Sequence, residues 1–196
     1  MLLEIINKFN WVDYIVTILI FLRIIWMGAV EGLVIEFFKF LGTIAATYAA
    51  LHYFTFLSDL ISRVIPHTKE ATPIEFIDFI CFTALAIIAY LIFVALRIVF
   101  YRFLKMEALP TLSKWGGFIL GILRGALLVS LIIFMLVISS IGYLKTSCAR
   151  SYSGKTLFSI TPKVYSWLWN NIAHKFIPGE KHNDTIQEIQ EDFMQS

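Results

Sequence analysis

Three charged residues, Glu36, Lys39 and Arg124, lie inside long apolar stretches of this 196-residue sequence. A charged side chain at the depth of lipid hydrocarbon costs about 2.5 kcal/mol or more unless it finds a partner or water. Glu36 and Lys39 are three residues apart, so they share one face of a helix. We therefore expect a polar intramembrane network of Glu36, Lys39 and Arg124, in which Arg124 pairs with Glu36. An alternative is that Glu36 and Lys39 lie near the membrane interface and neutralise each other.

The stretch around Arg124 has small residues on the same face. Residues 114–138 form an almost unbroken apolar run, which is long enough to cross a bilayer as a helix. Gly117, Gly121 and Gly125 recur every four residues, and Arg124 falls on their side of the helix. Small residues at this spacing let another helix approach closely. This face is therefore expected to contact protein rather than lipid alone.

Small residues also mark the first half of the chain. Gly28 and Gly32 bracket a short break between two apolar runs. This break predicts a tight hairpin between two spans, although a kinked continuation or a re-entrant turn is also compatible with it. In the following run, Ala46 and Ala50 share the face of Glu36 and Lys39. We predict that Gly28, Gly32, Ala46 and Ala50 are helix-packing positions.

The composition favours a membrane protein. The chain is 59% hydrophobic and 15% charged, whereas soluble domains are about 45–50% apolar and about 25% charged. Its mean hydropathy is +0.78. The net charge of +2 comes from scattered basic residues, so no nucleic-acid partner is expected.

Residue types that carry catalysis or bind metals are sparse. Cys81 and Cys148 have no metal-type spacing, and the four histidines are isolated in the sequence from each other and do not form a metal-type cluster with acids. No sequence motif of a hydrolase, a zinc protease or a phosphate-binding loop is present. We expect no enzyme activity, no catalytic residues, no metal site and no cofactor.

The apolar runs predict an all-α membrane protein, a bundle of about four transmembrane helices with a C-terminal amphipathic interfacial helix. The first run has no signal-peptide cleavage site, so we interpret it as a retained span. The expected organisation is a membrane domain at 1–145 with spans at about 11–27, 33–56, 74–100 and 115–142, a linker and amphipathic helix at 146–179, and an acidic flexible tail at 180–196.

Aromatic residues flank the membrane part. Trp11 and Tyr14 open the first span, and Trp167 and Trp169 lie in the amphipathic segment. These four residues suit the membrane interface. Packing of the segment against the base of the bundle is the alternative. Asp13 is expected to cap the first helix or to complement its positive end.

Charge in the loops suggests an orientation. The loop between the third and fourth spans is the most basic short loop, which places it in the cytoplasm and both termini outside, in the periplasm. Its basic residues are Arg97, Arg102, Lys105 and Lys114. Three basic residues after the fourth span oppose this assignment: Lys145, Arg150 and Lys155.

Several of these features together resemble the colicin V production protein family, small bacterial inner-membrane proteins, over about residues 9–177. The resemblance is carried by four features in order: Trp11, Asp13 and Tyr14; Gly32 followed by Glu36; Gly117, Gly121, Arg124 and Gly125; and the aromatic segment ending near Trp167 and Trp169. The sequence departs from the family pattern at Glu31, where an arginine is common, and at 112–114, where an acid is expected.

The resemblance implies an inner-membrane protein of about four spans with an outside C-terminus, linked to production or export of a peptide toxin and to envelope homeostasis. We consider two functions. The first is an accessory or scaffold protein in the lipid bilayer, which contacts a second copy or another membrane protein through the small-residue faces of its second and fourth spans. The second is a small oligomeric channel or transporter with a polar path lined by Glu36, Lys39 and Arg124.

Overall fold

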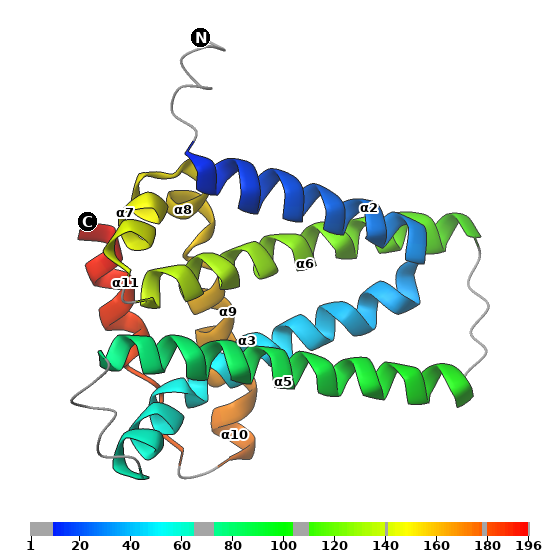
Figure 1. Ribbon diagram of the computed structural model, residues 1–196. Coiled ribbons are helices and arrows are strands. Elements are labelled where there is room, and N and C mark those ends of the chain that lie inside the picture. Colours follow the sequence, from blue (N-terminus) through cyan, green and yellow to red (C-terminus); the bar gives the residue numbers. More distant parts are fainter. Residues whose placement is uncertain (1–9, 65–72, 104–109, 140, 178–179, 196) are drawn as a thin grey trace.

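The computed structural model describes residues 10–64, 73–103, 110–139, 141–177 and 180–195. The described residues are almost entirely helical and contain no strand, and the chain is an all-α membrane protein, as predicted. Long helices lie side by side in Figure 1, and shorter ones gather at the end of this bundle where the N-terminal part begins. Lys105, which belongs to the predicted cytoplasmic loop, lies outside the described residues.

The first predicted span is helical but divided. A π-helix, η1 (Asp13–Phe21), continues directly into α2 (Leu22–Glu31). The chain then turns at Gly32 and enters α3 (Leu33–Val64). The break between the first two apolar runs is therefore a tight turn between two helices, which is the hairpin that the two glycines predicted.

Three described helices are long and apolar enough to cross a membrane: Leu33–Val64, Ile74–Phe100 and Ser113–Ile138. The last two belong to α5 (Ile74–Phe103) and α6 (Pro110–Ile138). The segment at 11–27 is not among the three, because η1 and α2 are each shorter than 18 residues. In α6, 61% of an 18-residue apolar stretch is buried within the protein, whereas in α5 only 11% of the corresponding stretch is buried. Helix α6 is therefore the centre of the bundle, and α5 lies at its edge.

Short helices follow α6, some of them in the region where the sequence predicts a polar linker. They are α7 (Gly142–Arg150), α8 (Tyr152–Leu157), α9 (Ile160–Leu168), η2 (Trp169–Ala173) and α10 (His174–Phe176). Helix α6 ends at Ile138, four residues before the end of the predicted span. Ser151 separates α7 from α8 and caps α8, since its hydroxyl accepts a hydrogen bond from the N–H of Gly154 at 2.9 Å. In Figure 1, α9 and α10 run across the direction of the long helices.

The C-terminal segment is a packed helix in place of the flexible tail that the sequence predicts. Helix α11 (Thr185–Gln195) buries Ile186 and Phe193. The physical reason is its pattern, in which Ile186, Ile189 and Phe193 recur on one side of an otherwise polar helix. That apolar side packs on the short helices, because the ring centroids of Phe193 and Phe158 are 4.2 Å apart.

A chain of aromatic rings forms the core between the long and the short helices. Phe54 of α3 contacts Phe82 of α5, with ring centroids 6.0 Å apart. Phe82 contacts Phe134 of α6 at 5.7 Å, and Phe134 contacts Phe158, the residue after α8, at 5.5 Å. Each of these rings is at most 2% exposed. The short helices are thus packed onto the bundle by the same core that holds the bundle together.

Candidate functional site

A buried ion pair joins the second and fourth predicted spans. Glu36 lies in the first turn of α3 and is 0% exposed, and Arg124 lies midway along α6 and is 5% exposed. The Nε of Arg124 is 2.5 Å from Oε1 of Glu36. The predicted pairing of Arg124 with Glu36 is therefore present in the structure. Each charge neutralises the other where neither reaches solvent.

The pair is held by charge and packing rather than by well-directed hydrogen bonds. Both carboxylate oxygens of Glu36 and the Nε of Arg124 are buried and lack a hydrogen bond of normal direction within the described part of the chain. Removing one member of such a pair leaves the other as an uncompensated buried charge, which costs about 3–5 kcal/mol. The two residues therefore depend strongly on each other.

Glycines bring α2 into backbone contact with α6 beside this pair. A Cβ atom on Gly28 would lie 2.6 Å from the carbonyl oxygen of Gly117 and 3.1 Å from the Cα of Gly121. It would also lie 3.4 Å from Cδ of Glu36. A Cβ on Gly117 would collide with the carbonyl oxygen of Gly28. These glycines thus allow the two helices to touch and leave room for the carboxylate.

The turn between α2 and α3 is fastened to the start of α6. Gly32 has a φ of +86°, a conformation that favours glycine. The N–H of Leu33 donates to the hydroxyl of Ser113 at 3.2 Å, and a Cβ on Gly32 would collide with that hydroxyl. Ser113 belongs to the segment 112–114, where the resemblance leads us to expect an acid. The hydrogen bond that its hydroxyl accepts from Leu33 was not predicted.

The other predicted packing positions are also inside the protein. Gly125, Ala46 and Ala50 are all buried. Ala50 belongs to the main hydrophobic core, and Ala46 lies one turn before it on α3. The small-residue faces of α3 and α6 are therefore used within one chain.

Lys39 does not join Glu36 and Arg124. Its Nζ contacts Oε2 of Glu31, on the other side of the turn at Gly32. Lys39 and Glu31 are partly exposed, with 12% and 25% of their side-chain areas accessible. Among the described residues, the direct contacts are therefore two ion pairs, Glu36–Arg124 and Lys39–Glu31, and the charges of Lys39 and Glu31 also act on Glu36.

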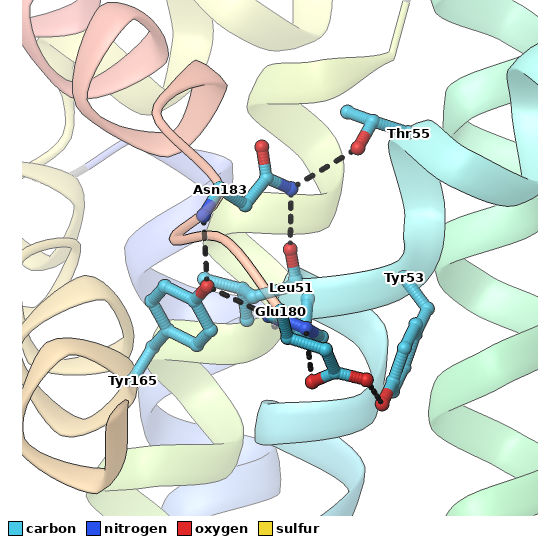
Figure 2. A network of polar contacts seen from close by, with 7 residues as sticks. Leu51, Tyr53, Thr55, Tyr165, Glu180 and Asn183 are labelled. Atoms are coloured by element: carbon cyan, nitrogen blue, oxygen red, sulfur yellow. Dashed lines mark hydrogen bonds and ion pairs between the residues drawn. The ribbon is translucent and has the colours of Figure 1, made fainter. Parts of the chain in front are cut away.

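A second polar cluster, which was not predicted, joins α3 to α9 and to the segment before α11 (Figure 2). The Nδ1 of His52 is 3.0 Å from the hydroxyl of Tyr165, and its Nε2 is 2.9 Å from Oε2 of Glu180. The hydroxyl of Tyr53 donates to Oε1 of Glu180 at 2.9 Å. His52, expected from the sequence to be isolated from acids, therefore contacts a carboxylate 128 residues away.

The rest of this cluster holds the segment from Glu180 to Asn183 against α3. The N–H of Asn183 donates to the hydroxyl of Tyr165 at 3.1 Å, and its side-chain amide donates to the carbonyl oxygen of Leu51 at 2.7 Å. Burial raises the pKa of Tyr165 to about 12. The Tyr165 hydroxyl therefore keeps its proton at neutral pH and can donate to Nδ1 of His52 while it accepts from Asn183.

Asp13 connects the first helix to the short helices. Its carboxylate accepts from the N–H of Asn10 at 2.9 Å, which is the expected capping role. It also accepts from the N–H and the hydroxyl of Ser153 and from the N–H of Tyr152, at the start of α8. One carboxylate thus serves two helix N-termini, the second of which the sequence did not indicate.

The four predicted interface aromatics have different surroundings. Tyr14 is exposed, and Trp11 is half-buried and stacks on Tyr143 with ring centroids 6.3 Å apart. Trp167 is 59% exposed, in accord with an interfacial position. Trp169 is only 6% exposed and stacks on His52, so the structure places it inside the protein rather than at a membrane surface.

Comparison with known proteins identifies one family. The family model described as "Colicin V production protein" matches residues 12–162. That range contains the Glu36–Arg124 pair and the glycine contacts, but Tyr165, Glu180 and Asn183 lie beyond it. Neither the curated proteins nor the solved structures contain a match.

Proposed function

The chain belongs to the colicin V production protein family, and from this premise we propose that it is a multi-pass accessory or scaffold protein of the bacterial inner membrane. In this role it supports toxin production or export, or envelope homeostasis, through a fixed helical bundle and without catalysis of its own. The observation that carries the proposal is the buried Glu36–Arg124 pair. A scaffold needs one stable arrangement of its helices, and this pair ties α3 to α6.

The placement of the termini follows from the ends of the bundle. The side-chain amide of Asn10 donates to the carbonyl oxygen of Ser147 at 3.0 Å, so the start of η1 lies beside α7. The N-terminal part and the helices after α6 therefore belong on one side of the membrane. The basic loop between α5 and α6 favours the cytoplasm for the other end of the bundle and so supports a periplasmic side for the termini, whereas Lys145, Arg150 and Lys155 oppose this orientation.

The partner surface of the scaffold lies on α5. The small-residue faces of α3 and α6, which were expected to contact a partner, contain Ala46, Ala50, Gly117 and Gly121 in contacts within the chain. Helix α5 leaves a continuous apolar side open, including Ile87, Leu91 and Ile98. We place contact with a second copy, or with another membrane protein, on this side of α5.

A channel receives less support from the same residues. A polar path needs Glu36, Lys39 and Arg124 to meet water along the bundle. Glu36 and Arg124 instead bury each other, and Lys39 pairs with Glu31. The scaffold is therefore the function that the geometry favours.

Two assays on the same variants test the scaffold. Colicin V secretion is measured in a bacterium that lacks its own copy and carries the wild type, Arg124→Leu or the Glu36→Leu/Arg124→Leu double variant. Ion and solute flux is measured with purified protein in liposomes. For a scaffold, secretion falls in the Arg124→Leu variant and recovers in the double variant, because folding is restored. The liposomes that contain the purified protein show no ion or solute flux.

The control is Arg23→Leu, which removes an exposed arginine from α2. It should leave secretion unchanged. A double variant that folds but does not secrete, together with wild-type flux that the double variant abolishes, would establish the channel and remove the scaffold.

A further inference from the structure

An apolar cavity lies on one side of the contact between the C-terminal helices and the bundle. It has a volume of about 510 Å³ and lies between α3, α5 and the run from α9 to α10. On α3 its wall is Leu41, Ile44, Ala45 and Tyr48, which recur on one side of the helix. We call this cavity the α3–α10 slot. These α3 residues belong to a helix that is long and apolar enough to cross a membrane.

The opposite wall of the slot is the apolar side of an amphipathic helix. It includes Leu168, Ile172 and Phe176, which are spaced four residues apart along the run from α9 to α10. Phe176 is 78% exposed, and Ile172 and the neighbouring Ile177 are also exposed. A helix that leaves large apolar side chains uncovered beside a cavity of the same character is suited to contact lipid chains.

Charge distinguishes the lipid that fits. The segment 160–177 contains Lys163, His174 and Lys175 and no acidic residue. All three are exposed, and His174 and Lys175 directly precede Phe176. Each lysine near a membrane surface attracts an anionic headgroup by about 1 kcal/mol. The slot therefore has an apolar interior with positive charge at the helix that forms its edge.

We propose that the α3–α10 slot binds one acyl chain of an anionic phospholipid, whose headgroup lies beside His174 and Lys175. The proposal depends on the chain being a membrane protein and is independent of the scaffold role. Lys163 and Lys175, in a segment without acidic residues, favour an anionic lipid over an apolar helix of a second copy as the occupant. An acyl chain is narrower than a helix and needs no hydrogen-bond partner in the slot.

The test measures lipids retained by the purified full-length protein in native mass spectrometry. The protein in detergent is mixed with equal amounts of phosphatidylglycerol and phosphatidylcholine that carry identical acyl chains. We expect one tightly retained lipid, with phosphatidylglycerol preferred about fivefold, the ratio that corresponds to about 1 kcal/mol. Equal retention of the two lipids by the wild type would overturn the proposal.

Two kinds of variant separate the headgroup from the chain. Lys175→Gln should abolish the preference but keep one retained lipid, whereas Ala45→Leu should reduce retention of both lipids because it fills the slot. Lys155→Gln is the matched control, since Lys155 is an exposed lysine on α8, away from the slot. An equal loss of preference in the Lys155 and Lys175 variants would mean general charge attraction and no site.

Folding is checked separately for the slot variant. Ala45 is half-buried and borders the open slot, so a larger side chain has room. If Ala45→Leu nevertheless lowers the helix content seen by circular dichroism, Ile172→Ala supplies the second variant. It leaves the slot wider and should weaken retention of the lipid by loss of contact. Unchanged retention in a folded Ile172→Ala protein would contradict the proposal.

Discussion

The Glu36–Arg124 pair and the His52 cluster are two buried polar regions that are built in opposite ways. In the first, two full charges lie 2.5 Å apart without a well-directed hydrogen bond among the described residues. In the second, His52, Tyr53, Tyr165, Glu180 and Asn183 form contacts of 2.9–3.1 Å, in which each named donor has an acceptor. The first joins two long helices of the bundle, and the second attaches the C-terminal segment to α3.

The difference shows what each location requires. Midway along α6, the main need is to neutralise charge, and the closeness of two helices meets it. At the junction with the short helices, the chain must position a segment that has few apolar side chains, and directed hydrogen bonds do this. We therefore expect the pair to be sensitive to loss of one charge and the cluster to be sensitive to loss of a single donor or acceptor.

The largest expected effect comes from removing half of the pair. Arg124→Leu leaves the Glu36 carboxylate buried without its partner and should lower stability by about 3–5 kcal/mol. Adding Glu36→Leu removes the stranded charge and should recover most of that loss. Thermal unfolding of the purified proteins, followed by circular dichroism in one detergent, measures Arg124→Leu, Glu36→Leu and the double variant.

Arg23→Leu serves as the control for this cycle, because Arg23 is exposed on α2. It should stay within about 0.5 kcal/mol of the wild type. Strictly additive losses from Arg124→Leu and Glu36→Leu would mean that the two residues act independently, and the comparison with the His52 cluster would lose its basis.

The next effect tests the contact that brings α2 to the pair. Gly117→Ala places a methyl group against the carbonyl oxygen of Gly28 and should cost about 1–3 kcal/mol. Gly142→Ala is the matched control, since a Cβ there meets nothing within 4 Å. The same unfolding measurement applies. If both variants were equally stable, the α2–α6 contact would be looser than described.

An effect of similar size but more local extent is expected in the His52 cluster. Tyr165→Phe leaves the N–H of Asn183 and Nδ1 of His52 without their partner, at a cost of about 1–3 kcal/mol. Hydrogen exchange should rise in residues 185–195, while exchange in α3 and α6 changes little. Tyr143→Phe, which removes the hydroxyl of an exposed tyrosine, is the control. Uniform protection in Tyr165→Phe would mean that the cluster does not hold α11.

The smallest effect is expected at the pair beside the turn. Lys39→Gln removes the contact with Glu31, whose side chain is one-quarter exposed, so solvent compensates part of the loss. We expect a change of at most about 1 kcal/mol in thermal unfolding. A loss of stability as large as that of Arg124→Leu would mean that Lys39, Glu36 and Arg124 act as one network, as the sequence predicts.

Much of the bundle could be predicted because its rules are local. Apolar length predicts α3, α5 and α6, and the glycine spacing predicts that α6 contacts protein. The pairing of Arg124 with Glu36 could be inferred because both residues lie on the small-residue faces of their helices. The contact of Gly117 with Gly28 could not be predicted, because glycine spacing identifies a contact face but not the helix that packs against it.

By itself, the sequence determined that this is an all-α membrane protein and that Arg124 needs a partner or water, because a charge in hydrocarbon is costly whatever the fold. Only the tertiary structure decided that Lys39 pairs with Glu31, that Asp13 also caps α8, and that His52 meets Glu180 128 residues later. These contacts depend on where helices cross and chain segments return, which no local pattern of residues specifies.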